Sequence, residues 1–221
     1  MLDYKMRPGR GSRAAVILHG FGASSADLYP LADELDGDGR LTWYFPEAPY
    51  GIRYGGAVLG KAWFPRNEQE VASAVEGSYF DRLEDMDPSD LSTAGSEIGE
   101  LISEVGASFD GLVLGGFSQG AMVAVEAVCR AGRSPSELIL FSGSVIAAQR
   151  WQEELAAVES FPFFQSHGTM DPILPFEGAR RLFSLLEGAG HAGEFRRFDG
   201  GHEVPGEVIE RVGRRLRGID Q

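Results

Sequence analysis

Short apolar runs recur along the chain, and each is bounded by turn-forming residues. The runs are rich in β-branched, leucine and aromatic side chains at successive positions, which is typical of strands buried on both faces of a sheet. This pattern predicts strands at residues 14–18, 42–45, 112–114, 138–141, 161–165 and 195–198.

Helical spacing of apolar residues fills the segments between these predicted strands. Four apolar residues between positions 28 and 35 mark one helix face, and a second helix begins at Pro88 and Ser89. Further helices are predicted at residues 121–128, 179–186 and 208–216. Strands that alternate with helices predict an α/β fold with a mostly parallel central sheet and helices on both faces.

The segment from about residue 46 to 87 interrupts this alternation with glycines and aromatic residues. A long excursion in a compact domain is often functional, so we expect it to form a lid-like part of a site. Neither a repeat nor a linker divides the chain, and 221 residues fit one α/β domain over residues 1–221.

The pentapeptide G-F-S-Q-G at residues 116–120 has the form G-x-S-x-G, which places a nucleophilic serine on a tight turn between a strand and a helix. Chance matches to so short a motif are common, and an ordinary glycine-rich turn is the alternative. The predicted strand 112–114 enters the motif and the predicted helix 121–128 leaves it, as the motif requires. This context favours Ser118 as a nucleophile.

A serine nucleophile needs a histidine base and a carboxylate that orients the histidine, in the chain order serine, acid, histidine. His202 follows the predicted strand 195–198 on a loop, whereas His191 precedes it and is expected to be a solvated histidine at a helix end. Of the two aspartates between the serine and His202, Asp199 lies only three residues before the histidine, while Asp171 sits in a turn after a predicted strand. We therefore expect Asp171 and His202 to act together.

Acyl transfer also needs N–H groups that stabilise the developing oxyanion. One expected donor is the N–H of Gln119, directly after the serine, and the other is the N–H of Phe21 in the loop H-G-F-G at residues 19–22. The glycines of that loop alternatively form only a turn, and His19 is more typical of a structural histidine.

Composition narrows the remaining possibilities. Apolar residues make up 43% of the chain and charged residues 24%, which allows a full core. A net charge of −13 disfavours nucleic acid and anionic membranes as partners. The single cysteine, Cys129, excludes an intramolecular disulfide, and neither a signal peptide nor a membrane-spanning run is recognised. We expect a cytoplasmic protein with no membrane span, no metal site and no cofactor.

The chain resembles the phospholipase/carboxylesterase family of α/β-hydrolases, which includes the acyl-protein thioesterases. The matching pieces are spread in order over nearly the whole chain, and their joint occurrence is far more specific than the pentapeptide alone. They are L-H-G-F-G at 18–22, P-E-A-P at 46–49, A-W-F at 62–64, G-F-S-Q-G-A-M at 116–122, F-S-G at 141–143, H-G at 167–168, D-P at 171–172 and G-H at 201–202.

The resemblance implies the α/β-hydrolase fold and a role for each of seven residues. It implies a catalytic triad of Ser118, Asp171 and His202. It also implies an oxyanion hole formed by Phe21 and Gln119, and an acyl groove lined by Trp63 and Ile173. For Trp63 a half-buried packing aromatic is the alternative. Ala23 and Pro65 stand where the thioesterase branch usually has aspartate, which favours a small esterase of bacterial type.

These expectations together describe a serine carboxylesterase that hydrolyses small acyl esters through an acyl-enzyme. An acyl thioesterase or lysophospholipase with the same triad is the alternative within catalysis, and a non-catalytic binding protein on the same fold is the alternative outside it. The expected partner is a small-molecule acyl ester. The oligomeric state stays open, with a homodimer as one option.

Overall fold

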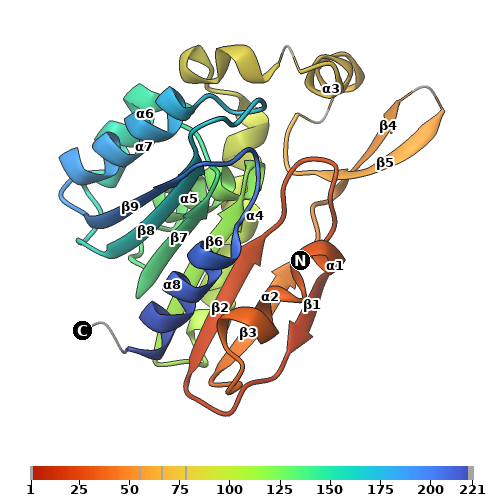
Figure 1. Cartoon of the computed structure of the whole chain (residues 1–221). Coiled ribbons are helices and arrows are strands. Elements are labelled where there is room, and N and C mark those ends of the chain that lie inside the picture. Colours follow the sequence, from red (N-terminus) through yellow and green to blue (C-terminus); the bar gives the residue numbers. More distant parts are fainter. Residues whose placement is uncertain (1, 55, 66, 78, 219–221) are drawn as a thin grey trace.

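A twisted sheet of seven strands organises the computed structural model, which describes residues 2–54, 56–65, 67–77 and 79–218 (Figure 1). The strand order is β1-β3-β2-β6-β7-β8-β9, and every neighbouring pair is parallel except β1 with β3. The strand bounds are β1 Tyr4–Arg7, β2 Arg13–Leu18, β3 Leu41–Pro46, β6 Gly111–Phe117, β7 Glu137–Phe141, β8 Pro162–Gly168 and β9 Ala192–Phe198. The predicted α/β fold with a mostly parallel sheet is confirmed.

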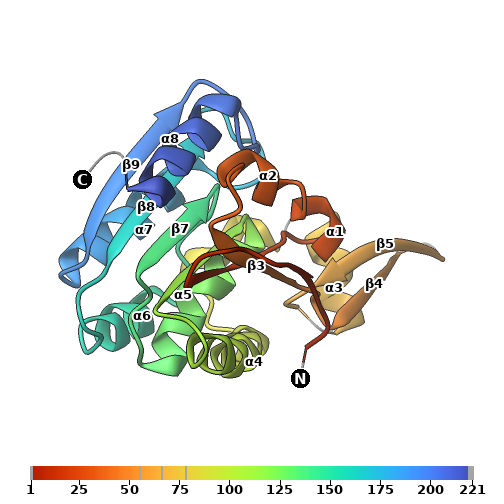
Figure 2. The same ribbon diagram turned by 90° about the horizontal axis from the view of Figure 1, so that it is seen from below.

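Side chains alternate between two cores along the buried strands. Val16 and Leu18 of β2 face one core, whereas Ala15 and Ile17 face the other, which is why the strand is apolar at successive positions. One face is covered by α4 Ser89–Gly106, α5 Gln119–Ala131, α6 Ala148–Leu155 and α7 Phe176–Gly188, and the other by α1 Ser25–Leu28, α2 Leu31–Leu35 and α8 Gly206–Arg217 (Figure 2). Within the residues described, no helix combines the length and the apolar composition that a bilayer crossing requires.

The structure adds elements that the hydrophobic pattern did not predict. The antiparallel edge strand β1 is largely exposed, so it carries no buried apolar run. Helix α6 has a strongly polar composition and buries only Trp151 and Leu155. The apolar face between residues 28 and 35 belongs to two short helices that Pro30 separates, rather than to one helix.

The excursion between β3 and α4 is folded. It contains the antiparallel hairpin of β4 Tyr50–Tyr54 and β5 Ala57–Ala62, helix α3 Glu68–Val75 and the 3₁₀ turn η1 Phe80–Asp85. Residues 55, 66 and 78 of the predicted 46–87 segment lie outside the described residues. The hairpin projects from the body beside the edge where the parallel strands end, and α3 lies above that edge (Figure 1).

Helix α5, which begins directly after Ser118, packs closely against α4. Gly95 of α4 allows this approach, because a Cβ at that position would overlap Glu126 Cγ. Glu126 cannot easily move aside, since its buried carboxylate accepts hydrogen bonds from Trp151 Nε1 at 2.6 Å and from Arg150 at 2.9 and 3.0 Å. The position of α5 therefore depends on a glycine in the neighbouring helix.

Two alanine substitutions in α4 test this packing. Gly95→Ala should lower the free energy of unfolding by about 1 to 3 kcal/mol, because the added methyl overpacks the interface. Gly99→Ala is the matched control, since its new Cβ would meet Ala131 at an ordinary 3.8 Å and its higher helix propensity favours folding by up to about 1 kcal/mol. Urea unfolding of both variants measures the difference, and equal effects would contradict this role of Gly95.

Candidate active site

Ser118 lies on a sharp turn between β6 and α5, as the sequence predicts. Its backbone has φ 57° and ψ −119°, a conformation that L-amino acids rarely adopt. Neighbouring glycines permit the turn, because a Cβ on Gly116 would overlap Gly120, and a Cβ on Gly120 would overlap the Leu18 carbonyl. The Ser118 N–H donates to Phe141 O at 2.8 Å, which ties the turn to the next strand.

Two loops meet beyond the ends of β8 and β9. The N–H of Thr169 donates to Phe198 O at 2.9 Å, and the N–H of Met170 donates to Gly200 O at 3.0 Å. Gly168 makes the approach possible, since a Cβ there would overlap the carbonyl oxygens of Gly200 and Gly201. The loops that carry Asp171 and His202 are therefore held together by their backbones.

His202 and Asp171 form a direct hydrogen bond across these loops, with 2.7 Å between Nδ1 and Oδ2. The Asp171 side chain is fully buried, whereas that of His202 is 16% exposed. Because ionised carboxylates only accept, Nδ1 carries the proton and Nε2 of the imidazole is left free as an acceptor. The His202 ring also packs on Phe117, with 4.8 Å between ring centroids.

Asp171 is saturated with hydrogen-bond donors. Oδ1 accepts from the N–H groups of Ile173 and Leu174 at 2.8 and 2.9 Å, and Oδ2 lies 3.2 Å from His167 Nε2 in addition to its bond with His202. Burial alone would raise the pKa of Asp171, but the hydrogen bonds from His167, His202 and Leu174 outweigh burial and hold that pKa well below its ordinary value. The carboxylate is therefore ionised at neutral pH.

His167 is the residue of this cluster that the sequence analysis did not single out. Its Nε2 also lies 2.9 Å from Leu174 O, and both neighbours of this nitrogen are acceptors, so Nε2 carries the proton. The sequence signals are the H-G pair at residues 167–168 among the family-like pieces and the place of His167 at the end of β8, four residues before Asp171.

The loop after β2 places Phe21 at the same end of the sheet. His19 supports this loop as a structural residue, since Nδ1 donates to Gly20 O at 2.8 Å and Nε2 accepts from the N–H of Ala48 at 3.1 Å. Burial lowers the pKa of His19, so the imidazole is neutral. Among the described residues, neither the Phe21 N–H nor the Gln119 N–H has a hydrogen-bond acceptor, which leaves both donors free.

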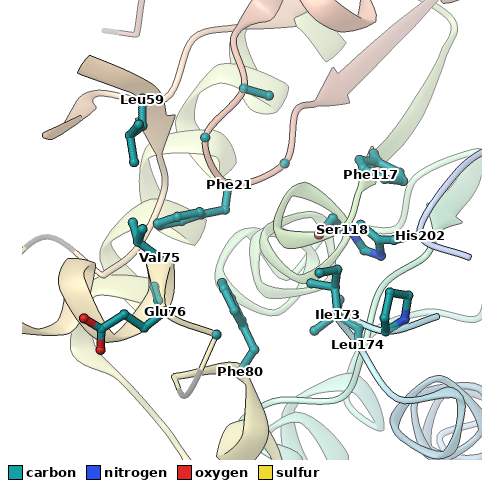
Figure 3. A pocket seen from close by; sticks show the side chains of 16 residues that line it. Phe21, Leu59, Val75, Glu76, Phe80, Phe117, Ser118, Ile173, Leu174 and His202 are labelled. Atoms are coloured by element: carbon teal, nitrogen blue, oxygen red, sulfur yellow. The ribbon is translucent and has the colours of Figure 1, made fainter. Parts of the chain in front are cut away.

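Ser118 and His202 line a cavity of about 640 Å³ that reaches under the excursion (Figure 3). In Figure 3 the His202 ring lies beside Ser118, and the Phe21 and Phe80 rings lie further along the cavity. These two rings pack edge to face with 5.7 Å between centroids. Apart from Ser118 and His202, the side chains that line the cavity are apolar except for Glu76, whose carboxylate points away from Ser118. Other lining residues are Leu59, Val75, Ile173 and Leu174.

The two residues expected in an acyl groove have different positions. Ile173 lines the cavity and is 50% exposed. Trp63 is fully buried and is not among the cavity-lining residues, because its indole N–H donates to the carbonyl of His19 at 2.8 Å and turns the ring into the core. Trp63 is thus a packing residue behind the loop that carries Phe21.

The expectation that His191 is solvated is wrong. His191 is only 3% exposed, and its ring stacks on Phe161 with 3.8 Å between centroids. Burial lowers its pKa. The residue follows a helix in sequence, but the start of β9 carries it into the core, away from the cavity that holds His202.

Comparison with known proteins shows which family the chain resembles in sequence. The family described as Phospholipase/Carboxylesterase matches residues 6–218. Acyl-protein thioesterase 1 of Eremothecium gossypii is 30% identical over 207 residues, which cover 89% of this chain and 83% of that protein. Carboxylesterase SOBER1 of Arabidopsis thaliana is 25% identical over 218 residues, covering 91% of this chain and 90% of that protein.

Solved structures show the same fold. The crystal structure of esterase PE8 superposes with a TM-score of 0.80 at 24% identity and covers 99% of both chains. The structure of Arabidopsis thaliana SOBER1 superposes with a TM-score of 0.74 at 22% identity and covers 93% of this chain and 98% of that one. The predicted α/β-hydrolase fold is confirmed.

The different surroundings of two histidines allow a paired test of the site. His202→Ala should leave the free energy of unfolding nearly unchanged and lower kcat by about 10⁴-fold or more, because the proposed base is lost. His191→Ala should keep most of the activity but destabilise the fold, since it leaves a hole beside Phe161. Steady-state kinetics and thermal unfolding of both variants are the measurements. Equal losses of kcat would show that the cavity histidine has no special role.

Proposed function

Because the chain belongs to the phospholipase/carboxylesterase family, we propose that it is a serine carboxylesterase whose catalytic residues are Ser118, His202 and Asp171. The family supports hydrolase activity of the esterase or thioesterase type. The observation that carries the finer proposal is the 2.7 Å bond between His202 and Asp171 at a cavity that Ser118 also lines. A base oriented by an ionised acid beside a serine is the arrangement that nucleophilic acyl transfer needs.

In the proposed mechanism, Ser118 Oγ attacks the ester carbonyl while His202 Nε2 takes the hydroxyl proton. Asp171 holds the imidazole in the tautomer that leaves Nε2 free and stabilises the imidazolium that forms. The imidazolium then gives its proton to the leaving alcohol, and the acyl group stays on the serine. Water attacks this acyl-enzyme with the same histidine as base, which releases the carboxylic acid and restores the serine.

The free N–H groups of Phe21 and Gln119 are the proposed oxyanion donors. Gly20, the residue before Phe21, packs against the nucleophile, since a Cβ on Gly20 would lie 3.3 Å from Ser118 Cβ, and Gln119 is the residue that follows Ser118. Donors that are already oriented stabilise the tetrahedral intermediate without reorganisation, and each is worth about 10²-fold to 10³-fold in rate.

The cavity supports an uncharged acyl group as the bound portion of the substrate. Its volume of about 640 Å³ falls in the usual range for small-molecule sites, and hydrocarbon side chains form most of its wall. The small acyl esters expected from the sequence fit this space. The extension of the cavity to Val75 and Phe80 also admits chains longer than acetyl.

An acyl thioesterase is the second candidate function, favoured by that extension under the excursion and by the relatedness to acyl-protein thioesterase 1. The catalytic steps are identical, and only the leaving group differs. Oxygen esters and thioesters with the same acyl chain, assayed side by side, distinguish the two functions through kcat/KM.

Replacing the proposed nucleophile tests the mechanism directly. Ser118→Ala should fold normally and lower kcat by about 10⁴-fold to 10⁶-fold, since no other group can form the acyl-enzyme. A fluorophosphonate probe should label the wild type at one site per chain and should not label this variant. Ser96→Ala, an exposed serine on α4, is the control and should be labelled like the wild type. Activity above a tenth of the wild-type rate in Ser118→Ala, or a wild type that the probe does not label, would point to a binding protein or another nucleophile.

The pH dependence follows from the charge states of the two partners. The base must be neutral to accept a proton, so kcat/KM should rise with pH, with a single-proton slope, and then level off. The lowered pKa of Asp171 keeps its carboxylate ionised throughout, so the acid adds no second limb there. The profile should be measured with an ester whose leaving group needs no protonation. A rate that is flat from pH 5 to 9 would show that no histidine base limits the reaction.

A further inference from the structure

The hairpin of the excursion is bonded to the loop that carries Phe21. The N–H of Gly22 donates to Lys61 O at 2.9 Å, and the N–H of Lys61 donates to Ala23 O at 3.0 Å. These two bonds form an antiparallel bridge between the loop and β5. The backbone on the C-terminal side of Phe21 therefore continues the small sheet of the hairpin.

Gly60 allows this bridge to form. Its φ is +130°, and a Cβ at this position would overlap the carbonyl oxygen of Gly22. A side chain at residue 60 would therefore push the loop away from β5. Gly56 in the same hairpin also has a positive φ, +83°, but a Cβ there would meet no atom within 4 Å.

A few residues after Gly60, the chain is also hydrogen-bonded to the side chain of Gln119. The buried Gln119 side chain accepts from the N–H of Trp63 at 2.9 Å through Oε1 and donates to Phe64 O through Nε2. The Trp63 indole N–H donates to His19 O at 2.8 Å, which adds a bond to the start of the Phe21 loop. Residues 60–64 thus contact both segments that carry a free N–H.

We propose that residues 60–64 form a template that sets the spacing between the N–H groups of Phe21 and Gln119, with Gly60 and the Gln119 side chain as its positioning residues. The inference rests on the proposed function, in which these N–H groups bind the oxyanion. The loop after β2 and the start of α5 belong to different crossover units. The bonds to residues 60–64 add a direct link between them, close to the reacting serine.

This role has a distinct kinetic signature. Oxyanion donors act on the transition state more than on bound substrate, so a misplaced donor lowers kcat with little change in KM. A thionoester, in which sulfur replaces the carbonyl oxygen, develops charge on a large and weakly accepting atom. Its hydrolysis therefore depends less on these N–H groups. The ratio of ester to thionoester rates reports on the oxyanion donors, whereas a loss of folded protein lowers both rates equally.

The test uses Gln119→Met, which keeps the backbone N–H but removes both amide bonds, and Gly60→Ala, with Gly56→Ala as the control for positive φ. In both test variants we expect kcat for a p-nitrophenyl ester to fall by about 10-fold to 10²-fold, as for partial loss of one donor, and the ester to thionoester ratio to fall with it. Gly56→Ala should keep the wild-type ratio. Thermal unfolding identifies a test variant that does not fold. If Gly60→Ala or Gln119→Met fails to fold, the rate ratio of the other test variant tests the proposal.

A wild-type ratio in Gly60→Ala and Gln119→Met, in folded and active protein, would overturn the template while leaving the proposed esterase function intact. Full activity of Ser118→Ala would instead contradict the proposed function, so the two failures are distinguishable. An equal fall of the ratio in Gly56→Ala would also overturn the template, because a methyl group added there would meet no atom within 4 Å.

Discussion

The strained backbone of Ser118 is the constraint on which the site depends. A residue with φ 57° and ψ −119° is unfavourable in isolation, by about 1 to 3 kcal/mol, and it persists only where surrounding contacts determine it. Here β6 and the first turn of α5 meet so closely that Gly116 and Gly120 cannot carry side chains. The buried α4 and α5 interface and the parallel sheet hold both elements in place. The core thus supports a conformation that presents one hydroxyl to the cavity.

The other groups of the site reach that hydroxyl from loops that are individually short. Each of these loops leaves the same edge of the parallel sheet, after β2, β6, β8 or β9, so their ends converge without long excursions. The β8 and β9 loops are further joined by backbone bonds, and Asp171 is fixed by two N–H groups of its own turn. Little conformational freedom is left to Asp171, which suits its proposed role of orienting His202.

The sequence was most informative where a pattern has one physical explanation. Successive apolar positions predicted the buried strands, and chain order with strand ends singled out Asp171 and His202, which the structure places in contact. Features that depend on distant backbone atoms were not predictable in this way. The Trp63 ring is held in the core by a hydrogen bond to the carbonyl of His19, 44 residues away. His191 is buried because its ring stacks on Phe161. The edge strand β1 has no apolar pattern because it is exposed.

The excursion between β3 and α4 has a consequence for how such a protein diverges. One continuous stretch, with α3 and η1 at its far end, supplies Val75 and Phe80 to the distal wall of the cavity. The proposed nucleophile, acid and base all come from other parts of the chain. Mutations that reshape this wall therefore fall in α3 and η1, outside both the proposed triad and residues 60–64. Selection for a new acyl group can act on these two elements by small steps, with an active enzyme present at each of them.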